Sequence, residues 1–280
     1  MMGANFRSSF VAIKDPGDPR LAAYNSLKGK SLERDGIFIA EGEKVIKSMV
    51  ESGCRIASSL TARGVITRYG SLLAIMAKRG ALVYVAADKL IEEIIGFRFH
   101  KGIMAVGHCP KKLTVSAALK GPKRPLFIVA LNAVNDPQNV GLIARNAAAF
   151  GVQALIVDHA TYDPYYRKAV RVSMGAIFRL PVCYEEDLAP SLIQLKKRHN
   201  TRIIAATPGR GTSDISKVEL SGTICFVFGN EDKGISSRVL SIADAKVRIP
   251  ISKNVDSLNV ASASAVCLYE ASRYRSQLRS

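Results

Sequence analysis

The sequence predicts an α/β protein with a parallel sheet in its C-terminal part and a smaller α/β sandwich domain before it. Three observations predict this fold class. Strand-like apolar runs alternate with helix-like runs along the 280 residues. After residue 125 the strand-like runs are apolar almost without interruption, which is typical of parallel strands buried on both faces. A basic segment with three prolines, residues 108–127, lies between the two regions and indicates a linker.

These observations divide the chain. We predict a flexible leader at 1–18, a small α/β sandwich domain at 19–110, a linker at 111–124 and a second α/β domain at 125–280. In the first domain, apolar runs ended by glycines predict strands over 36–42, 81–86 and 102–108, and helical spacing predicts helices over 43–53 and 88–96.

The second domain continues the alternation. The predicted strands are 126–132, 153–158, 201–207, 222–229 and 247–251, and the predicted helices are 140–151, 188–200 and 257–278. Ligands of parallel sheets bind where the strands end at their carboxyl side. The segments NAVNDPQN, ATPGRG, GNEDKG and ISKNVDSLN should therefore lie along one rim of the sheet.

The amino-acid composition indicates which class of partner the protein binds. Lysine and arginine exceed aspartate and glutamate by 40 to 23, a net charge of +17, with a larger excess before residue 125 than after it. Such a balance favours a polyanionic partner, most often nucleic acid. The five scattered cysteines form no metal-ligand spacing, and the sequence has neither a signal peptide nor a long apolar span. We expect a cytoplasmic protein without metal or membrane contact.

Two segments could bind an anion or a cofactor. In NAVNDPQNVGLIARNAAAFGV, Asn139 and Gly141 lead into a helix, and Arg145 follows four residues later near its positive end. A capped helix with a solvated arginine explains this segment equally well. GNEDKG, residues 229–234, lacks the spacing of a dinucleotide or triphosphate loop. Its acids suit a neutral or cationic ligand, although a solvated turn explains them too.

A third segment, IPISKNVDSLNVASASAVCLYE, starts the last helix. Ser257 and Asn259 bracket the helix start and offer a cap and a side-chain amide, and the alanines and serines that follow permit close packing. Taken alone, this pattern also fits a capped structural helix.

Together, NDPQNVGLIARNAAAFG, FVFGNEDKG and IPISKNVDSLNVASASA resemble the three signature motifs of the SpoU (TrmH-like) family of RNA ribose 2′-O-methyltransferases in the SPOUT superfamily. VRVSMGAIFRLPV, between the first two, is also similar to the family. FIAEGEKVIKSMVESG and HKGIMAVGH resemble the N-terminal substrate-binding domain of many members. The resemblance implies a C-terminal trefoil knot, bound S-adenosylmethionine, a homodimer and an RNA substrate, ribosomal or transfer RNA.

The resemblance also implies the site residues. The family's polar active-site positions correspond to Asn139, Arg145, Glu231, Ser257 and Asn259, and its cofactor contacts to Thr207, Gly229, Asn230, Gly234, Ile249, Ile251 and Leu258. Ala205 and Ala206 should line the side of the pocket next to Thr207. GNEDKG departs from commoner forms of its loop at Asn230 and Asp232, which leaves the contacts there open.

The implied reaction moves a methyl group from a cationic sulfur to a ribose hydroxyl. Because a guanidinium group keeps its proton at neutral pH, we expect Arg145 to hold a phosphate and stabilise the developing alkoxide. Two alternatives stay open: an RNA-binding homologue that dimerises without catalysis, and a SPOUT enzyme that methylates a base.

Overall fold

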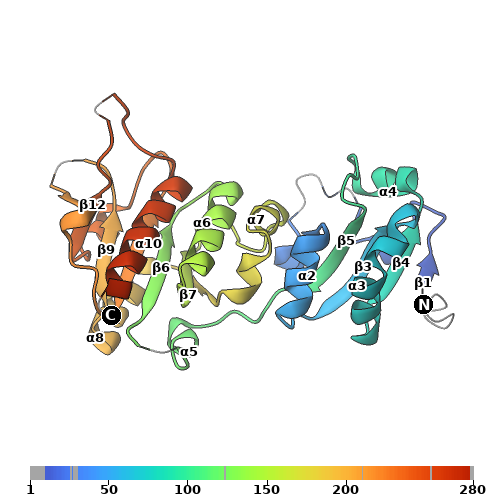
Figure 1. The fold of residues 1–280 in the computed structure, drawn as a ribbon, viewed down its shortest axis with the longest axis horizontal. Helices are drawn as coiled ribbons and strands as arrows, with labels where there is room; N and C mark the ends of the chain where they lie inside the picture. Colours follow the sequence, from blue (N-terminus) through green and yellow to red (C-terminus); the bar gives the residue numbers. More distant parts are fainter. Residues whose placement is uncertain are drawn as a thin grey trace. The chain divides into compact units, whose positions relative to one another are not determined.

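The computed structural model describes residues 10–25, 27, 31–122, 124–209, 211–252 and 254–277. The chain forms two compact units (Figure 1). The first comprises Met1–Pro110 and Tyr165–Phe178, and the second comprises Lys111–Pro164 and Arg179–Ser280. A short segment from the second half of the sequence therefore belongs to the first unit.

Within the described residues, the first unit holds a five-stranded mixed sheet in the order β1-β4-β3-β5-β2. Its strands are β1 (Phe10–Ala12), β2 (Ile37–Glu41), β3 (Ile56–Ala62), β4 (Leu82–Ala86) and β5 (Ile103–His108), and its helices are α2 (Glu43–Glu51), α3 (Ile66–Lys78), α4 (Asp88–Ile95) and α7 (Arg167–Val172). Leu60, Tyr84 and Met104 of the sheet pack with Ile91 and Ile95 of α4 in a buried cluster.

The leader prediction fails in part. Residues 1–9 lie outside the described residues, but Phe10–Ala12 pair with Val83–Val85 as a parallel edge strand. This strand is held because Ile13, directly after it, is buried in the core of the first unit and donates a backbone hydrogen bond to Val85.

Within the described residues, the second unit holds a seven-stranded, all-parallel sheet in the order β10-β12-β9-β11-β6-β7-β8. Its strands are β6 (Phe127–Asn132), β7 (Ala154–Asp158), β8 (Val182–Glu185), β9 (Arg202–Ala206), β10 (Ser213–Asp214), β11 (Ile224–Gly229) and β12 (Ala245–Arg248). The parallel sheet confirms the predicted fold class. The trefoil knot stays a prediction from the resemblance.

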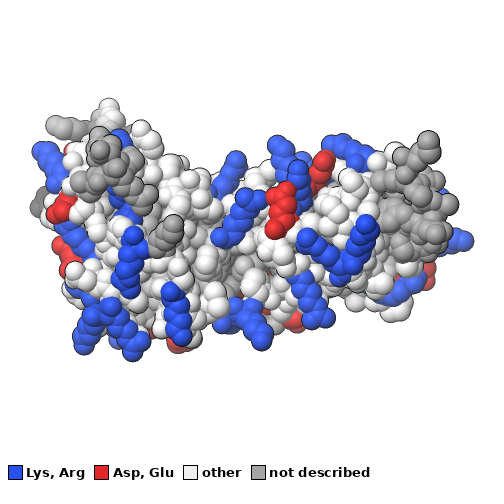
Figure 2. Space-filling view, turned by 60° about the horizontal axis from the view of Figure 1, so that its bottom comes forward, with Lys and Arg blue, Asp and Glu red and all other residues white. Residues whose placement is uncertain are grey.

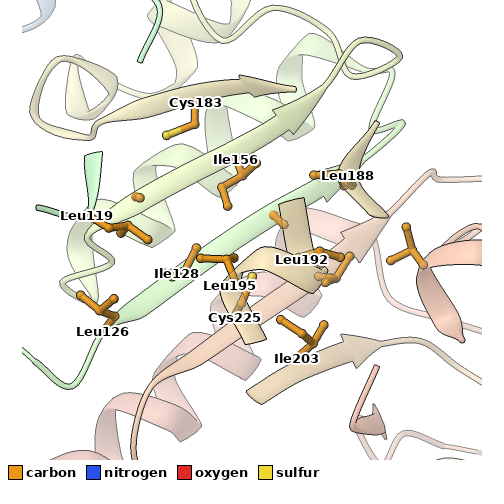
Figure 3. Packing of buried hydrophobic residues seen from close by; sticks show 14 of the residues in the cluster. Leu119, Leu126, Ile128, Ile156, Cys183, Leu188, Leu192, Leu195, Ile203 and Cys225 are labelled. Carbon is orange, nitrogen blue, oxygen red and sulfur yellow. The ribbon is translucent and has the colours of Figure 1, made fainter. Parts of the chain in front are cut away.

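Helices cover both faces of this sheet. They are α5 (Val115–Ala118), α6 (Pro137–Ala149), α8 (Leu188–His199), α9 (Ser237–Leu240) and α10 (Val260–Gln277). Because side chains alternate along a strand, Ile128, Ile156 and Cys225 meet Leu192 and Leu195 of α8 on one face (Figure 3). On the other face α6 and α10 pack side by side (Figure 1).

The predicted linker is part of the second unit's core. Thr114 caps α5 by accepting a hydrogen bond from the amide of Ala117, and Ala118 and Leu119 pack into the buried cluster with α8. The predicted linker is therefore not a free connection, because Ala118 and Leu119 are buried in the core beside the sheet. None of the helices in the described part of the chain is long and apolar enough to cross a membrane.

Candidate active site

The site lies where the central strands of the parallel sheet end. The last residues of β6 and β11, Asn132 and Gly229, are register partners. The chain leaves β9 at Thr207, whose amide donates to the carbonyl of Val247 in β12. Parallel strands present their carboxyl ends on one edge, so the four loops meet there, as the sequence predicts.

A buried carboxylate fixes the loop after β6. Asp158, at the end of β7, is 7 % exposed and accepts hydrogen bonds from Asn132 Nδ2 at 2.7 Å and from the amide of Ala133 at 3.0 Å. Thr161 donates to the same carboxylate through its amide and hydroxyl groups. Asn132 Oδ1 in turn accepts from the amide of Ser236 at 2.8 Å, which ties the loops after β6 and β11 together.

The loop after β11 requires both of its glycines. A Cβ on Gly229 would lie 2.5 Å from the backbone of Gly234 and Ile235, closer than any side chain tolerates. Gly234 has a φ of +68°, the left-handed region that favours glycine. The backbones of Asn230 and Gly234 pair at 3.1 and 3.0 Å, and Asn230 Oδ1 accepts from the amides of Asp232 and Lys233. The loop is thus a closed turn held at its base.

Glu231 projects from this turn and joins it to the start of α6. Its carboxylate accepts from the amide of Asn135 at 3.2 Å, the amide of Asp136 at 3.3 Å and Asn139 Nδ2 at 2.7 Å. The first two donors lie in the loop that leads into α6, where Asp136 is the cap, and Asn139 lies in its first turn. Backbone N–H groups at a helix start carry partial positive charge and favour a carboxylate.

The network continues to the last helix. Asn139 Oδ1 accepts from Asn259 Nδ2 at 3.0 Å, and Asn259 Oδ1 caps α10 by accepting from the amides of Ala261 and Ser262. Asn139 is 5 % exposed, so its amide is fully committed to Glu231 and Asn259. Side chains from the three motif segments are thereby linked in one chain of hydrogen bonds.

An open cleft lies between β9, β12 and the start of α10. The space between these elements, counted together with its open mouth, is about 430 Å³. Most of the lining is apolar, and two hydroxyl groups face it. The lining residues are Ala206, Thr207, Pro208, Val247, Arg248, Ile249, Ile251, Ser257, Leu258, Ala263 and Cys267. Burial raises the pKa of the Cys267 thiol to about 12, so it lines the cleft as a neutral group.

The structure places the predicted residues in three groups. Glu231, Asn139 and Asn259 form the hydrogen-bonded chain described above. Five others line the cleft: Thr207, Ile249, Ile251, Ser257 and Leu258. Gly229, Asn230 and Gly234 shape the turn after β11 and are not among the lining residues; Asn230 uses its amide to donate to the carbonyl of Ala133 at 2.8 Å. Ala205, unlike Ala206, faces the buried cluster beneath α8.

Arg145 belongs to none of these three groups. The helix starts at Pro137, earlier than predicted, so Arg145 lies in its second half and not near its positive end. The field of a helix end fades within one turn, so the dipole argument holds for Asn139 but not for Arg145. The Arg145 side chain is exposed, and among the described residues it has no hydrogen bond or ion pair.

Sequence reasoning missed several residues that build the site. Asp158 and Asn132 hold the loop after β6, Asn146 ties α6 to the carbonyl of Ala261 at 2.9 Å, and Arg248 lines the cleft. A usable signal existed for Asp158, because a carboxylate that directly follows an apolar parallel strand lies on the ligand-binding edge.

The fold and the site define a class: an α/β enzyme whose parallel sheet carries an apolar cleft beside a polar hydrogen-bonded chain. Residues 126–269 match the model of the SpoU rRNA Methylase family. The chain is 33 % identical over 269 residues to an uncharacterized tRNA/rRNA methyltransferase of Mycobacterium bovis, covering 93 % of this chain and 91 % of the relative. It is 34 % identical over 179 residues to the 23S rRNA (guanosine-2'-O-)-methyltransferase RlmB of Pasteurella multocida, covering 63 % and 72 %.

A solved structure resembles both units. The AdoMet-bound rRNA methyltransferase from Sinorhizobium meliloti superposes with a TM-score of 0.83 at 25 % identity, over 95 % of this chain and 98 % of that one. The chain belongs to the SpoU rRNA methylase family.

Proposed function

We propose that this protein is an S-adenosylmethionine-dependent RNA methyltransferase that methylates a ribose 2′-hydroxyl. The observation that carries this proposal is the hydrogen-bonded chain Glu231–Asn139–Asn259, which brings the three motif segments together beside the cleft. A protein that only bound RNA would have no use for a largely apolar cleft next to such a hydrogen-bonded chain. The names of the relatives favour ribosomal RNA as the substrate.

The residues present fit the cofactor. The cleft's apolar wall of Ile249, Ile251 and Leu258 suits an adenosine ring, and Thr207 and Ser257 offer hydroxyl groups. Gly229 leaves room for the backbone of the loop after β11 to turn sharply. When bound, S-adenosylmethionine supplies a methyl group activated by a sulfonium cation. Because Glu231 and Asp232 lie in the loop after β11, their charge favours a cation over an anion nearby.

The chain's own residues orient the ribose hydroxyl and stabilise the negative charge that develops on its oxygen. Glu231 fixes the loop before α6 through three hydrogen bonds, which sets the position of Asn139. Arg145 is unpaired among the described residues and exposed, so its guanidinium is free to hold an RNA phosphate. With the cofactor bound, the bond from its methyl carbon to sulfur would break and leave a neutral thioether as the ribose oxygen gains the methyl group. The hydroxyl proton would pass to water, and Arg145 would stabilise the negative charge that develops on the ribose oxygen.

The exposed apolar surface supports a homodimer. Val255 is 51 % exposed, Leu258 39 %, Val266 39 % and Tyr269 57 %, and all four lie on or just before α10. Leaving these side chains in water is unfavourable, and their burial by a second copy of the chain would remove that cost. Sedimentation velocity should give a mass twice that of the monomer, which is 30.2 kDa. A monomer at the concentrations used in the methylation assay would contradict the dimer.

One experiment tests the function. The purified protein is titrated with S-adenosylmethionine by calorimetry and then incubated with labelled cofactor and either ribosomal or transfer RNA, and the RNA is digested to nucleosides. We expect saturable binding and label in 2′-O-methylated nucleosides. Binding without transfer would indicate the non-catalytic alternative, and label in a base would indicate a base methyltransferase.

A further inference from the structure

Ala133, the first residue after β6, has a backbone conformation that alanine rarely adopts. Its φ is +59°, in the left-handed region, where the Cβ of an L-residue crowds the following carbonyl oxygen. Among the described residues, only Met174 and Asn200 share a positive φ without being glycine, and Asn200 ends α8 as its cap. A residue in such a conformation needs surrounding contacts that maintain it.

Two side chains from other segments bind the two peptide groups of Ala133. Its amide donates to the two oxygens of the Asp158 carboxylate at 3.0 and 3.1 Å, and its carbonyl accepts from Asn230 Nδ2 at 2.8 Å. Neither partner is free to move. Asp158 is buried, and Asn230 is fixed in its own turn because its Oδ1 accepts from two backbone amides there.

The conformation of Ala133 sets the direction of the loop that leads into α6. A left-handed residue turns the chain sharply away from the line of the strand. Val134, the next residue, is buried in the core. The amides of Asn135 and Asp136 then donate to the Glu231 carboxylate at 3.2 and 3.3 Å. Each residue between β6 and α6 is therefore held by a hydrogen bond or by burial.

Resting on the proposed function, we propose that Asp158 and Asn230 are positioning residues for methyl transfer: they hold Ala133 in its left-handed conformation and thereby set the start of α6. Asn139 lies in the first turn of α6, so its place beside Glu231 depends on this loop. Among the described residues, neither Asp158 nor Asn230 lines the cleft, so both act through the loop. This role of Asn230 differs from the cofactor contact that the family resemblance implies.

Asn230→Asp removes one of the two hydrogen bonds and keeps the turn after β11. The new carboxylate still accepts from the amides of Asp232 and Lys233, but it places an oxygen instead of the Nδ2 donor against the carbonyl of Ala133. We expect single-turnover transfer at saturating cofactor and RNA to fall by about 10- to 100-fold, because small displacements of positioning groups have effects of this size.

The affinity for S-adenosylmethionine separates positioning from cofactor contact in this variant. The substitution adds a negative charge to the loop after β11, and a negative charge does not repel a cationic ligand. The Kd of the cofactor, measured by calorimetry, should therefore stay within about threefold of the wild-type value or fall. A raised Kd with a wild-type rate at saturating cofactor would make Asn230 a cofactor contact and overturn its positioning role.

Ala133→Gly tests whether the conformation of residue 133 links the two side chains to transfer. Glycine adopts a positive φ without the help of Asp158 or Asn230. Added to Asn230→Asp, it should raise the rate by about threefold or more, with Ala133→Gly alone as the reference. Asn200→Gly is the matched control, because it makes a similar change at the left-handed residue that ends α8, and it should restore nothing. Equal recovery with both glycines, or none with either, would contradict the proposal.

Hydrogen–deuterium exchange measures the loop without relying on catalysis. In Asn230→Asp we expect faster exchange in a peptide that covers residues 133–136, unchanged exchange in β6, and a return toward wild type when Ala133→Gly is added. Asp158→Asn, which replaces an acceptor of the Ala133 amide, should speed exchange in the same peptide. Should this buried variant not fold, Asn230→Asp decides the question, because Asn230 is only half-buried.

The failure of this inference differs from the failure of the proposed function. If the wild-type protein methylates RNA, and Asn230→Asp transfers and exchanges like wild type, the positioning role is wrong and the proposed function stands. If the wild-type protein transfers no methyl group, while exchange of the loop rises in Asn230→Asp and falls again with Ala133→Gly, the hold on Ala133 stands and the enzymatic proposal fails.

Discussion

Glu231 accepts hydrogen bonds from three N–H groups at the start of α6. In Glu231→Gln, one oxygen becomes an NH₂ group that faces these donors, so at least one hydrogen bond to a charged acceptor is lost, with a cost of about 1.5–3 kcal/mol. We expect methyl transfer to fall by about 10- to 100-fold. The measurement is single-turnover transfer from labelled S-adenosylmethionine at saturating RNA.

Asp232→Asn is the matched control, because it removes a charge from the next residue of the same loop. The Asp232 carboxylate has no hydrogen bond among the described residues, so its charge can affect only the affinity for the cofactor; at saturating S-adenosylmethionine this variant should transfer methyl groups at close to the wild-type rate. Equal losses in both variants would mean that only the charge of the loop matters, and not the bonds to α6.

Arg145 offers the opposite case of a site residue without partners in the described chain. Because its side chain is exposed and unpaired there, Arg145→Ala should leave the Tm and the S-adenosylmethionine Kd unchanged. The rate of transfer should fall by about 10²–10³-fold, as when a single oxyanion donor is removed. Lys217→Ala, an exposed cation elsewhere in the second unit, serves as the control. Wild-type rates in Arg145→Ala would remove Arg145 from the catalytic residues.

At the scale of an element, the turn after β11 depends on Gly229. In Gly229→Ala the new methyl group would overlap the backbone of Gly234 and Ile235, so the turn must open. Overpacking of this kind costs about 1–3 kcal/mol. We expect a lower Tm and at least tenfold weaker binding of S-adenosylmethionine by calorimetry. Gly121→Ala has open space and an ordinary φ and should change neither; a wild-type Kd for Gly229→Ala would show that the turn does not shape the cleft.

The contact between α8 and the start of β12 predicts a pH dependence. Burial alone would raise the pKa of Asp244, but the hydrogen bond from Lys196 at 2.6 Å and the amide of Ile203 at 2.8 Å outweigh it and lower the pKa. A lowered carboxyl pKa stabilises the fold above the unfolded value of about 4, and this stabilisation is lost as the pH falls through the folded value.

Asp244→Asn should therefore lower stability at neutral pH by about 1 kcal/mol or less, since both partners are about one-third exposed and the pair is screened by water. Thermal unfolding of wild type and variant, followed from pH 7 downward, measures the difference in Tm. The difference should shrink below a pH of about 4. A constant difference would indicate that Asp244 acts through shape and not through charge.

Sequence periodicity predicted five of the seven strands described in the second unit, because both faces of a parallel sheet are buried; it did not predict β8 and β10, which lie at the two edges. It failed where contacts with distant segments determine the structure. Phe10–Ala12 forms a strand because it pairs with β4, and the predicted linker is anchored because Ala118 and Leu119 are buried in the core. For the site, Glu231, Asn139 and Asn259 could be predicted to converge because they follow strands or start helices at one edge. Asp158 was missed because its burial depends on Asn132 and Ala133, which lie in another segment, although its place at the end of an apolar strand indicates the ligand-binding edge.

At the scale of the whole molecule, the net charge of +17 predicts that the affinities for RNA and for S-adenosylmethionine depend differently on salt concentration. Lysine and arginine predominate over acidic side chains on the face of the molecule in Figure 2. RNA binding releases counterions from each neutralised phosphate, so its log K falls with log salt with a slope of about −0.7 per contact on single strands. The cleft proposed for S-adenosylmethionine is largely apolar, so binding of the cofactor should lack this counterion contribution.

With about five phosphate contacts, RNA affinity should fall by about 100-fold between about 50 and 200 mM salt. The affinity for S-adenosylmethionine should change by less than about threefold over the same range, because screening reaches exposed charges more than an apolar cleft. Anisotropy for RNA and calorimetry for the cofactor, in matched buffers, measure the two slopes. Parallel slopes would mean that the positive charge acts on the fold or on the cofactor, and not on the RNA.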